Sequence, residues 1–299
     1  MLPAFAKINL SLRVLGKRED GYHELDTIFQ TVSLLDTIKI SAIESSEIAF
    51  SCDDRSLPTD SHNLVVRAAT ALRDRVQAKK GARIRLEKRI PTHAGLGGGS
   101  SDAAATLIGL TRLWELKTSR EEFNELAAKL GADVSFFLYG GTARGTGIGD
   151  RIEPLEDAPE TFLLIVKPNA NVSTADAYKA LEKPALTSSN SKTILSRSEA
   201  KGFFDNQYLA SLQNDFEAVA FTAAPEIERA KAALKNAGAQ AALLAGSGSA
   251  VFGIFGSEDA QRRAIQAIEL ETGWRVFPCK TVGREQYQAS LYSVSEARA

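Results

Sequence analysis

Apolar and polar residues alternate from position 4 to position 14 of the chain. The apolar positions are Ala4, Ala6, Ile8, Leu10, Leu12 and Val14, and the positions between them are Phe5, Lys7, Asn9, Ser11 and Arg13. This period of two predicts a β-strand with one apolar face and one mostly polar face. A polar face of this kind is, from spacing alone, typical of a strand side that contacts water. Further strands are predicted at 27–35, 36–41 and 82–90.

Periods close to 3.6 residues predict helices at 63–76, 120–130, 206–221, 225–236 and 259–270. Another helix begins near residue 100, and one that begins at Thr174 carries Tyr178 and Lys179. Short apolar runs predict strands at 161–167, 241–244, 251–255 and 274–277. The second half thus has the order strand, helices, strand, strand, helix, strand, which predicts a βαββαβ domain. Residues 184–198 predict a loop, and the tail from Gln286 is weakly patterned and is expected to fray.

The composition is that of a globular protein. Of the 299 residues, 44% are hydrophobic and 24% are charged, and the formal net charge is −1. Such a charge indicates no large basic surface for nucleic acid, and no apolar run reaches the roughly 20 residues of a membrane span. The two cysteines, Cys52 and Cys279, show no metal-ligand spacing, which fits a reducing compartment. We therefore expect a cytoplasmic protein without nucleic-acid or membrane partners.

The most informative segment runs from Pro91 to Ala105 and reads Pro-Thr-His-Ala-Gly-Leu-Gly-Gly-Gly-Ser-Ser-Asp-Ala-Ala-Ala. Four glycines in five positions are followed by hydroxyl and acidic residues that suit a helix start. Glycine lets backbone N–H groups approach an anion, and a helix N-terminus favours negative charge. The segment therefore predicts a phosphate-binding loop. It lacks the lysine of G-x-x-x-x-G-K-[ST] and the third glycine of the dinucleotide-binding pattern.

This segment resembles the phosphate loop of the GHMP superfamily, which includes galactokinase, homoserine kinase, mevalonate kinase and phosphomevalonate kinase. The form Gly-Gly-Gly-Ser-Ser-Asp-Ala-Ala at 97–104 is most similar to the 4-diphosphocytidyl-2-C-methyl-D-erythritol kinase family. The resemblance extends from Ala6 to about Lys280. It implies an α+β protein with the active site between two domains. Residues 1–155 would form a ribosomal-protein-S5-like ATP-binding domain, and residues 156–299 a ferredoxin-like domain.

The implied reaction transfers the γ-phosphoryl group of ATP to the 2-hydroxyl of 4-diphosphocytidyl-2-C-methyl-D-erythritol, in the non-mevalonate route to isoprenoid precursors. Asp133, in Leu-Gly-Ala-Asp-Val, and Lys7, in Ala-Lys-Ile-Asn-Leu, lie in segments similar to the family's catalytic segments. Asp133 would accept the substrate proton or orient the hydroxyl. Lys7 would favour the ionised carboxylate and stabilise developing negative charge. From position alone, an aspartate before an apolar run predicts an N-cap.

The resemblance also implies the remaining site residues. Those on the ATP side are Asn63, Lys88, Pro91, Gly95, Leu96, Gly97, Gly98, Gly99, Ser100 and Ser101. Those on the substrate side are Asn9, Tyr22, His23, Tyr178 and Lys179, and the turn Gly246-Ser247-Gly248 would face the active site. Residues 140–150 resemble another family segment, with Asp150 where glutamate is usual. Without the resemblance, Tyr22 and His23 fit a packed pair, Lys88 a strand lysine, and 246–248 a hairpin loop.

Two other functions fit parts of the sequence. One is a superfamily kinase for a different small molecule, although Tyr22, His23 and Tyr178 suit a cytosine ring. The other is a sensor that binds ATP without turnover, although Lys7 and Asp133 are both present. Magnesium is expected with ATP. Ser100 or Ser101 could contact phosphate or magnesium, but the sequence offers no clear second carboxylate ligand.

Overall fold

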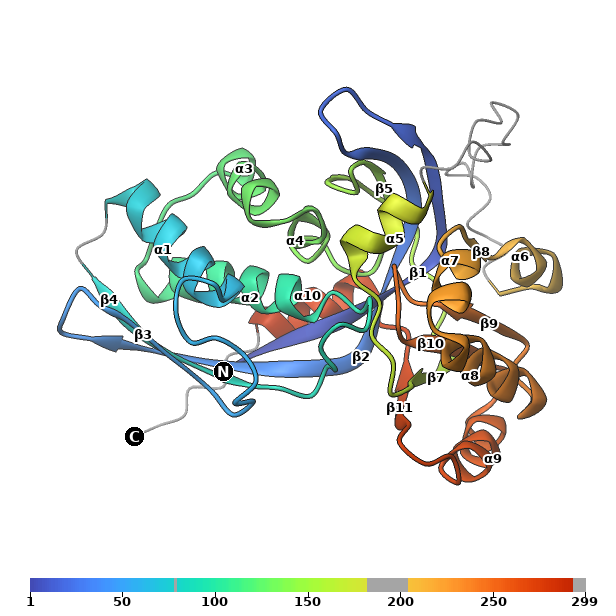
Figure 1. The fold of residues 1–299 in the computed structure, drawn as a ribbon. Helices are drawn as coiled ribbons and strands as arrows, with labels where there is room; N and C mark the ends of the chain where they lie inside the picture. The colour runs from blue at the N-terminus through green and yellow to red at the C-terminus, as the bar shows by residue number, and fades with distance from the viewer. Residues whose placement is uncertain (78–79, 182–203, 293–299) are drawn as a thin grey trace.

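The computed structural model describes residues 1–77, 80–181 and 204–292. Two β-sheets, each with helices packed on it, lie next to each other (Figure 1). The predicted loop at 184–198 falls outside the described residues. In the described part of the chain, no helix has the length and apolar character needed to span a membrane.

The N-terminal sheet has the strand order β3-β4-β2-β1-β8, and β5 and β6 extend it from β2. Its strands are β1 (Leu2–Lys17), β2 (His23–Ile43), β3 (Ile48–Cys52), β4 (Gly81–Glu87), β5 (Thr142–Gly147), β6 (Arg151–Pro154) and β8 (Gln213–Asn214). Four helices cover one face: α1 (Leu64–Val76), α2 (Gly98–Leu113), α3 (Arg120–Leu130) and α4 (Ala132–Phe136). Their apolar stripes bury Leu72, Leu107 and Phe136 in one core cluster with Ile84 of the sheet. This burial positions the starts of α1, α2 and α4 close together.

The C-terminal sheet is antiparallel, in the order β11 (Arg275–Lys280), β7 (Phe162–Lys167), β10 (Val251–Phe255) and β9 (Ala241–Leu244). Helices α5 (Thr174–Leu181), α7 (Glu217–Ala223), α8 (Pro225–Asn236) and α9 (Glu258–Ile268) pack on one face, and α6 (Asn206–Ser211) precedes β8. The strand order and the intervening helices confirm the predicted ferredoxin-like βαββαβ arrangement.

The two sheets share an apolar core, which joins the halves of the molecule. Ala6 and Ile8 of β1 pack with Ile165 of β7 and Phe252 of β10, and Leu96 of the glycine loop is buried in the same cluster. The glycine loop is thereby anchored between the sheets.

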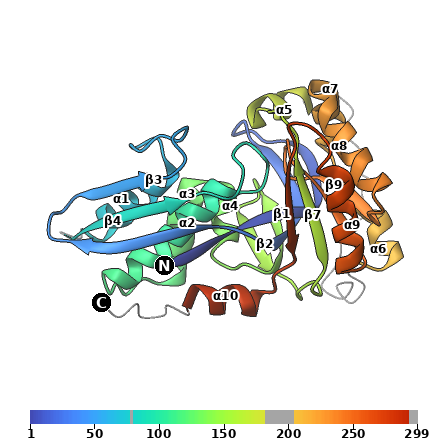
Figure 2. The same cartoon turned by 90° about the horizontal axis from the view of Figure 1, so that it is seen from below.

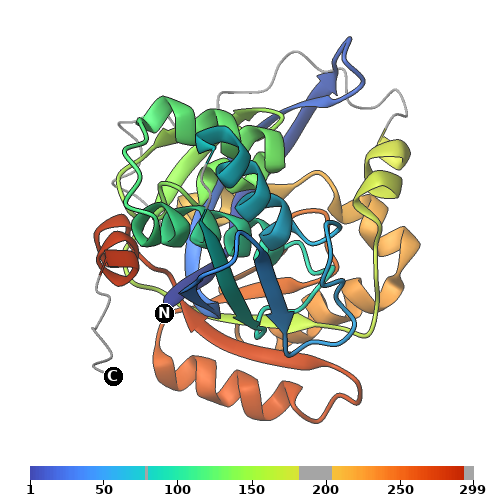
Figure 3. The same ribbon diagram turned by 90° about the vertical axis from the view of Figure 1, so that its left-hand side faces the viewer.

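The last described helix, α10 (Arg284–Tyr292), returns to the N-terminal half, apart from α9 (Figures 2 and 3). Tyr287 packs with Phe5 and its hydroxyl donates to the carbonyl of Phe137 at 2.5 Å. The expectation of a frayed tail is therefore wrong up to residue 292. Two other expectations are also wrong: residues 27–41 lie in the single strand β2, and the segment 206–221 is interrupted by β8.

Candidate active site

Strand β1 and helix α4 bring Lys7 and Asp133 together. Nζ of Lys7 lies 3.2 Å from Oδ2 of Asp133 and donates to Oδ1 of Asn9 at 2.9 Å. Nδ2 of Asn9 donates to Oγ1 of Thr27 at 2.8 Å, and this hydroxyl donates to the carbonyl of Ser11. The Lys7 side chain is 4% exposed and that of Asp133 is 32% exposed. The chain of bonds therefore fixes the ammonium, while the carboxylate remains open to a ligand.

Two expectations made from position alone are wrong here. The polar face of β1 is not a solvent-exposed strand side, because Lys7 and Asn9 are buried and Nζ of Lys7 lies 5.3 Å from the centre of the Phe29 ring. Asp133 is not an N-cap. Gly131 holds that position, and Asp133 lies in the first turn of α4. There its negative charge is favoured by the helix dipole.

The glycine loop ends at Gly97, which caps α2 with a φ of 70°. A Cβ on Gly97 would lie 2.9 Å from the Phe137 ring and 3.0 Å from Cγ of Lys7, so only glycine fits. The backbone N–H of Lys7 donates to the carbonyl of Leu96 at 3.0 Å, which ties the loop to β1. Ser100 lines the adjoining cleft, but Ser101 is only 2% exposed. Of the two serines, Ser100 is the one placed to contact a ligand.

The turn at 246–248 packs closely against the glycine loop. A Cβ on Gly95, where φ is 75°, would overlap the carbonyl of Ala245. The N–H of Ala250 donates to the carbonyl of Ala94 at 3.2 Å. On its outer side, the hydroxyl of Ser247 lies 2.9 Å from that of Thr174. The turn is therefore part of the wall formed by both domains.

Aromatic rings gather at the other end of the cleft. The His23 and Tyr178 rings stack with centroids 4.9 Å apart and planes at 28°. Phe216 meets Tyr178 edge-on at 4.8 Å. Burial, and to a lesser degree the charge of Asp133, raises the pKa of Tyr178, so its hydroxyl stays neutral. Tyr22 is 61% exposed, and Lys179 is exposed beside Asp176.

These groups meet in one cleft of about 950 Å³ between the two halves. Its predicted lining residues are Lys7, Asn9, Tyr22, His23, Gly95, Gly97, Ser100, Asp133, Tyr178, Lys179, Gly246 and Ser247. The volume lies toward the upper end of small-molecule sites, which run from about 300 to 1,000 Å³. The cleft is therefore large enough for a small-molecule site, and its lining reaches from the glycine loop to the aromatic end.

Comparison with known proteins gives consistent matches. The family models described as "GHMP kinases N terminal domain" and "GHMP kinases C terminal" match residues 63–141 and 200–272. A 4-diphosphocytidyl-2-C-methyl-D-erythritol kinase of Syntrophotalea carbinolica is 43% identical over 277 residues, 93% of this chain and 97% of that protein. One of Bacillus cereus is 41% identical over 272 residues, 90% of this chain and 92% of that protein.

The chain belongs to the 4-diphosphocytidyl-2-C-methyl-D-erythritol kinase family. A crystal structure of a 4-(cytidine 5'-diphospho)-2C-methyl-D-erythritol kinase superposes with a TM-score of 0.79 at 35% identity, over 94% of this chain and 98% of that one. L. major mevalonate kinase, at 17% identity, shares the fold with a TM-score of 0.72 over 93% and 94% of the two chains. The resemblance stated from the sequence motifs is thus confirmed.

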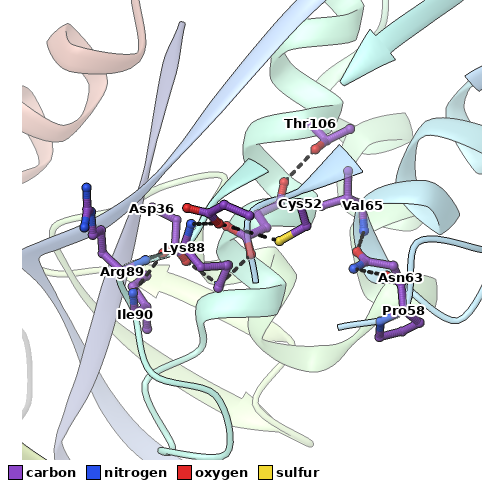
Figure 4. A network of polar contacts seen from close by, with 11 residues as sticks. Asp36, Cys52, Pro58, Asn63, Val65, Lys88, Arg89, Ile90 and Thr106 are labelled. Atoms are coloured by element: carbon purple, nitrogen blue, oxygen red, sulfur yellow. Dashed lines mark hydrogen bonds and ion pairs between the residues drawn. The ribbon is translucent and has the colours of Figure 1, made fainter. Parts of the chain in front are cut away.

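In this kinase chain, two residues expected on the ATP side have polar groups already engaged (Figure 4). Oδ1 of Asn63 caps α1 through the N–H of Val65 at 2.9 Å, and its Nδ2 donates to the carbonyl of Pro58 at 2.9 Å. Nζ of Lys88 donates to Oδ2 of Asp36 at 2.5 Å and to Oδ2 of Asp102 at 2.9 Å. Lys88 and Pro91 line a separate hollow of about 240 Å³. Their contact with a nucleotide stays a prediction.

Asp36, Lys88 and Asp102 form a buried triad behind the glycine loop of this kinase. Oδ1 of Asp36 also accepts from the backbone N–H groups of Arg89 and Ile90. Burial raises the pKa of the Asp102 carboxyl to about 8 against the opposing pull of Lys88, and its Oδ1 has no partner in the described structure. Burial lowers the pKa of Lys88, but the two carboxylates outweigh it and leave that pKa raised. The triad joins β2 to both ends of the loop.

Sequence reasoning missed three residues of this site. Thr27 orients Asn9, and Asp36 holds the strand end before the loop, but neither lies in a motif that the chain displays. Asp102 lies within the glycine motif, where its type suggested only a helix start. Oδ1 of Asp150, whose role the sequence left open, accepts a hydrogen bond from the backbone N–H of Ile148 in the turn between β5 and β6.

Proposed function

We propose that this protein transfers the γ-phosphoryl group of ATP to the 2-hydroxyl of 4-diphosphocytidyl-2-C-methyl-D-erythritol. The products are ADP and the 2-phosphate, and the step belongs to the non-mevalonate route to isoprenoid precursors. The observation that carries the proposal is the Lys7–Asp133 pair in a cleft beside the glycine loop, within a chain 41–43% identical to kinases of that name.

In the proposed reaction, the Asp133 carboxylate accepts the proton of the 2-hydroxyl as the oxygen attacks the γ-phosphorus. Lys7 holds the carboxylate in place and offers positive charge to the transferring group. Phosphoryl transfer passes through a loose transition state, so positioning and charge stabilisation supply most of the catalysis. Asn9 and Thr27 contribute by fixing the ammonium.

The two ligands would occupy opposite ends of the cleft. The backbone of residues 95–101 would hold the α- and β-phosphates of ATP at the start of α2. Tyr22, His23 and Tyr178 would hold the cytosine ring, because stacked aromatic faces with polar edges suit a flat heterocycle. Lys179 and the turn at 246–248 would close the site around the substrate.

Magnesium is part of the proposal, since ATP chemistry calls for it. The cleft offers one carboxylate, Asp133, and the hydroxyl of Ser100. No group of three ligating side chains able to hold a metal occurs among the described residues. This donor set fits a Mg²⁺ ion held largely by phosphate oxygens and water, as is usual for Mg²⁺. When bound, the ion would neutralise phosphate charge. A cytoplasmic location also stays a prediction.

The test is ADP release from MgATP with and without the cytidine substrate. Wild-type protein is expected to turn over only with substrate. Asp133→Asn keeps the size of the side chain and removes the base, so kcat is expected to fall by about 10²–10⁴. Lys7→Met is expected to lose about 10²–10³. The matched control is Lys39→Met, because Lys39 lies outside the cleft in a half-exposed pair with Glu87.

Absence of turnover with this substrate would refute the proposal, and turnover with mevalonate or homoserine instead would redirect it within the superfamily. If Asp133→Asn keeps kcat within tenfold of wild type, the carboxylate orients the hydroxyl and does not act as the base.

A further inference from the structure

The cleft carries much more positive charge than the chain as a whole. The formal net charge of the chain is −1. Among the described residues that line the cleft, four cationic side chains face a single carboxylate, Asp133; the cations are Lys7, Arg67, Lys129 and Lys179. An excess of one sign in a concave site raises the local concentration of oppositely charged ligands. The cleft is thus built for polyanions.

The glycine loop itself supplies no charge to such a ligand. It contains no lysine between Pro91 and Ala105. The nearest candidate, Lys88, is turned away into the buried triad with two carboxylates. Lys7 is paired with Asp133. Because Lys7 shares its charge with Asp133, the terminal phosphates of ATP would gain from a further cationic side chain besides Lys7 and Mg²⁺.

Arg67 lies where its guanidinium could contact the terminal phosphates of ATP. It lies on α1 three residues after Leu64, whose Cδ1 is 3.5 Å from where a Cβ on Gly99 would be, so the two share the face toward the start of α2. Helical side chains lean toward the N-terminus of their helix, which directs the guanidinium toward the glycine loop. Arg67 is exposed and lines the cleft with Gly97 and Ser100. No hydrogen bond or ion pair joins its guanidinium to another described residue.

We propose that Arg67 binds the β- and γ-phosphates of ATP from the α1 side, opposite the backbone of the glycine loop. A guanidinium offers paired donors that match two phosphate oxygens, which a lysine cannot reproduce. The inference rests on the proposed kinase function and adds a binding residue to it. Lys129, on the last turn of α3 near Asp133, lines the same wall and adds charge without a fixed position.

The experiment compares Arg67→Gln and Arg67→Lys with Arg75→Gln. Arg75 is also an exposed arginine of α1, but it faces Glu122 and Glu125 at 3.6 and 3.9 Å. Calorimetry measures binding of ATP, ADP and AMP with Mg²⁺. Loss of a charged hydrogen-bonding partner predicts that Arg67→Gln weakens ATP binding by about 10- to 100-fold. ADP should be affected less and AMP not at all. Arg67→Lys should fall between, and Arg75→Gln should match wild type.

An unchanged ratio of ATP to AMP affinity in Arg67→Gln overturns the inference. A rise in KM for the cytidine substrate with no change for ATP overturns it too, because the arginine would then serve the other ligand. If wild-type protein binds ATP through Arg67 but shows no turnover with the cytidine substrate, the inference holds and the proposed function fails. Thermal unfolding of each variant shows that the exposed substitution leaves the fold intact.

Discussion

Replacing Lys88 by methionine tests whether the buried triad holds the glycine loop in place. The substitution keeps most of the aliphatic stem and removes the one cation that contacts Asp36 and Asp102 in the described structure. All three side chains are at most 8% exposed. Breaking a buried ion pair by removal of one partner costs about 3–5 kcal/mol, because the remaining charge stays buried.

The local contacts place the expected cost near the lower end of that range. Asp36 keeps the backbone N–H groups of Arg89 and Ile90 as donors. Asp102 leaves little buried charge behind, because its raised pKa of about 8 favours the protonated form at pH 7. We therefore expect Lys88→Met to lower the free energy of unfolding by about 3 kcal/mol. The KM for ATP should rise as well, because the strand end and the start of α2 lose their common anchor.

Urea unfolding at pH 7, followed by circular dichroism, measures the change. Lys39→Met is the matched control: its ammonium lies 2.7 Å from Glu87 one strand away, and its side chain is 41% exposed. Exposed pairs are worth at most about 1 kcal/mol. If Lys88→Met costs no more than Lys39→Met, the triad does not stabilise the fold and the reasoning from burial is refuted.

Three further changes test other parts of the site. Burial raises the pKa of Asp102 above its unfolded value, so the folded protein binds more protons and its free energy of unfolding falls from about pH 4 to about pH 8. Asp102→Asn should flatten the decline of the urea-derived free energy of unfolding between these pH values. An equal slope in the wild-type and variant proteins would contradict this expectation. His93 has a φ of 51°, in the left-handed region that glycine adopts at lower cost. His93→Gly should therefore raise the free energy of unfolding by up to about 1 kcal/mol. A lower free energy of unfolding would instead reveal a stabilising contact of the imidazole ring. Gly95→Ala should weaken ATP binding about tenfold or more, because of both its φ and the overlap with the neighbouring turn. A Cβ on Gly99 meets the protein only at an ordinary distance, so Gly99→Ala should weaken ATP binding less than Gly95→Ala does, and equal losses of affinity would count against this reasoning.

The sequence predicted those elements whose period is carried by local side chains. Helices α1 and α3 and the βαββαβ order of the second domain follow from such patterns. The pattern divides strand β2 in two because the pairing with β1 shifts register between Phe5 and Ala6, opposite Leu35 and Val32. A bulge of this kind reverses which residues face the core, so a period-two pattern breaks although the strand continues. Helix α10 is short, and its packing on Phe5 depends on contacts distant in the sequence.

The sequence motifs predicted which segments form the candidate site, but not which side chains contact one another within it. The motifs identified Lys7, Asp133 and the glycine loop, and the structure brings them to one cleft. No pattern indicated that Asp36 would meet Lys88, since that pairing depends on how β2 and β4 lie in the sheet. The same holds for Thr27, which reaches Asn9 across the β1–β2 ladder.

The residues on the ATP side differ in whether their polar groups are already hydrogen-bonded within the protein or are available to a ligand. Asn63 and Lys88 occupy positions that the family resemblance places near the nucleotide, yet their polar groups are bonded to the protein. Such residues influence binding through the backbone that they hold, and their removal should act on loop geometry. Arg67 belongs to no motif, but its guanidinium lines the cleft without a partner among the described residues. Binding of a polyphosphate requires a cationic group that is not already paired within the protein. We therefore expect Arg67, and not Lys88, to determine the preference for ATP over AMP.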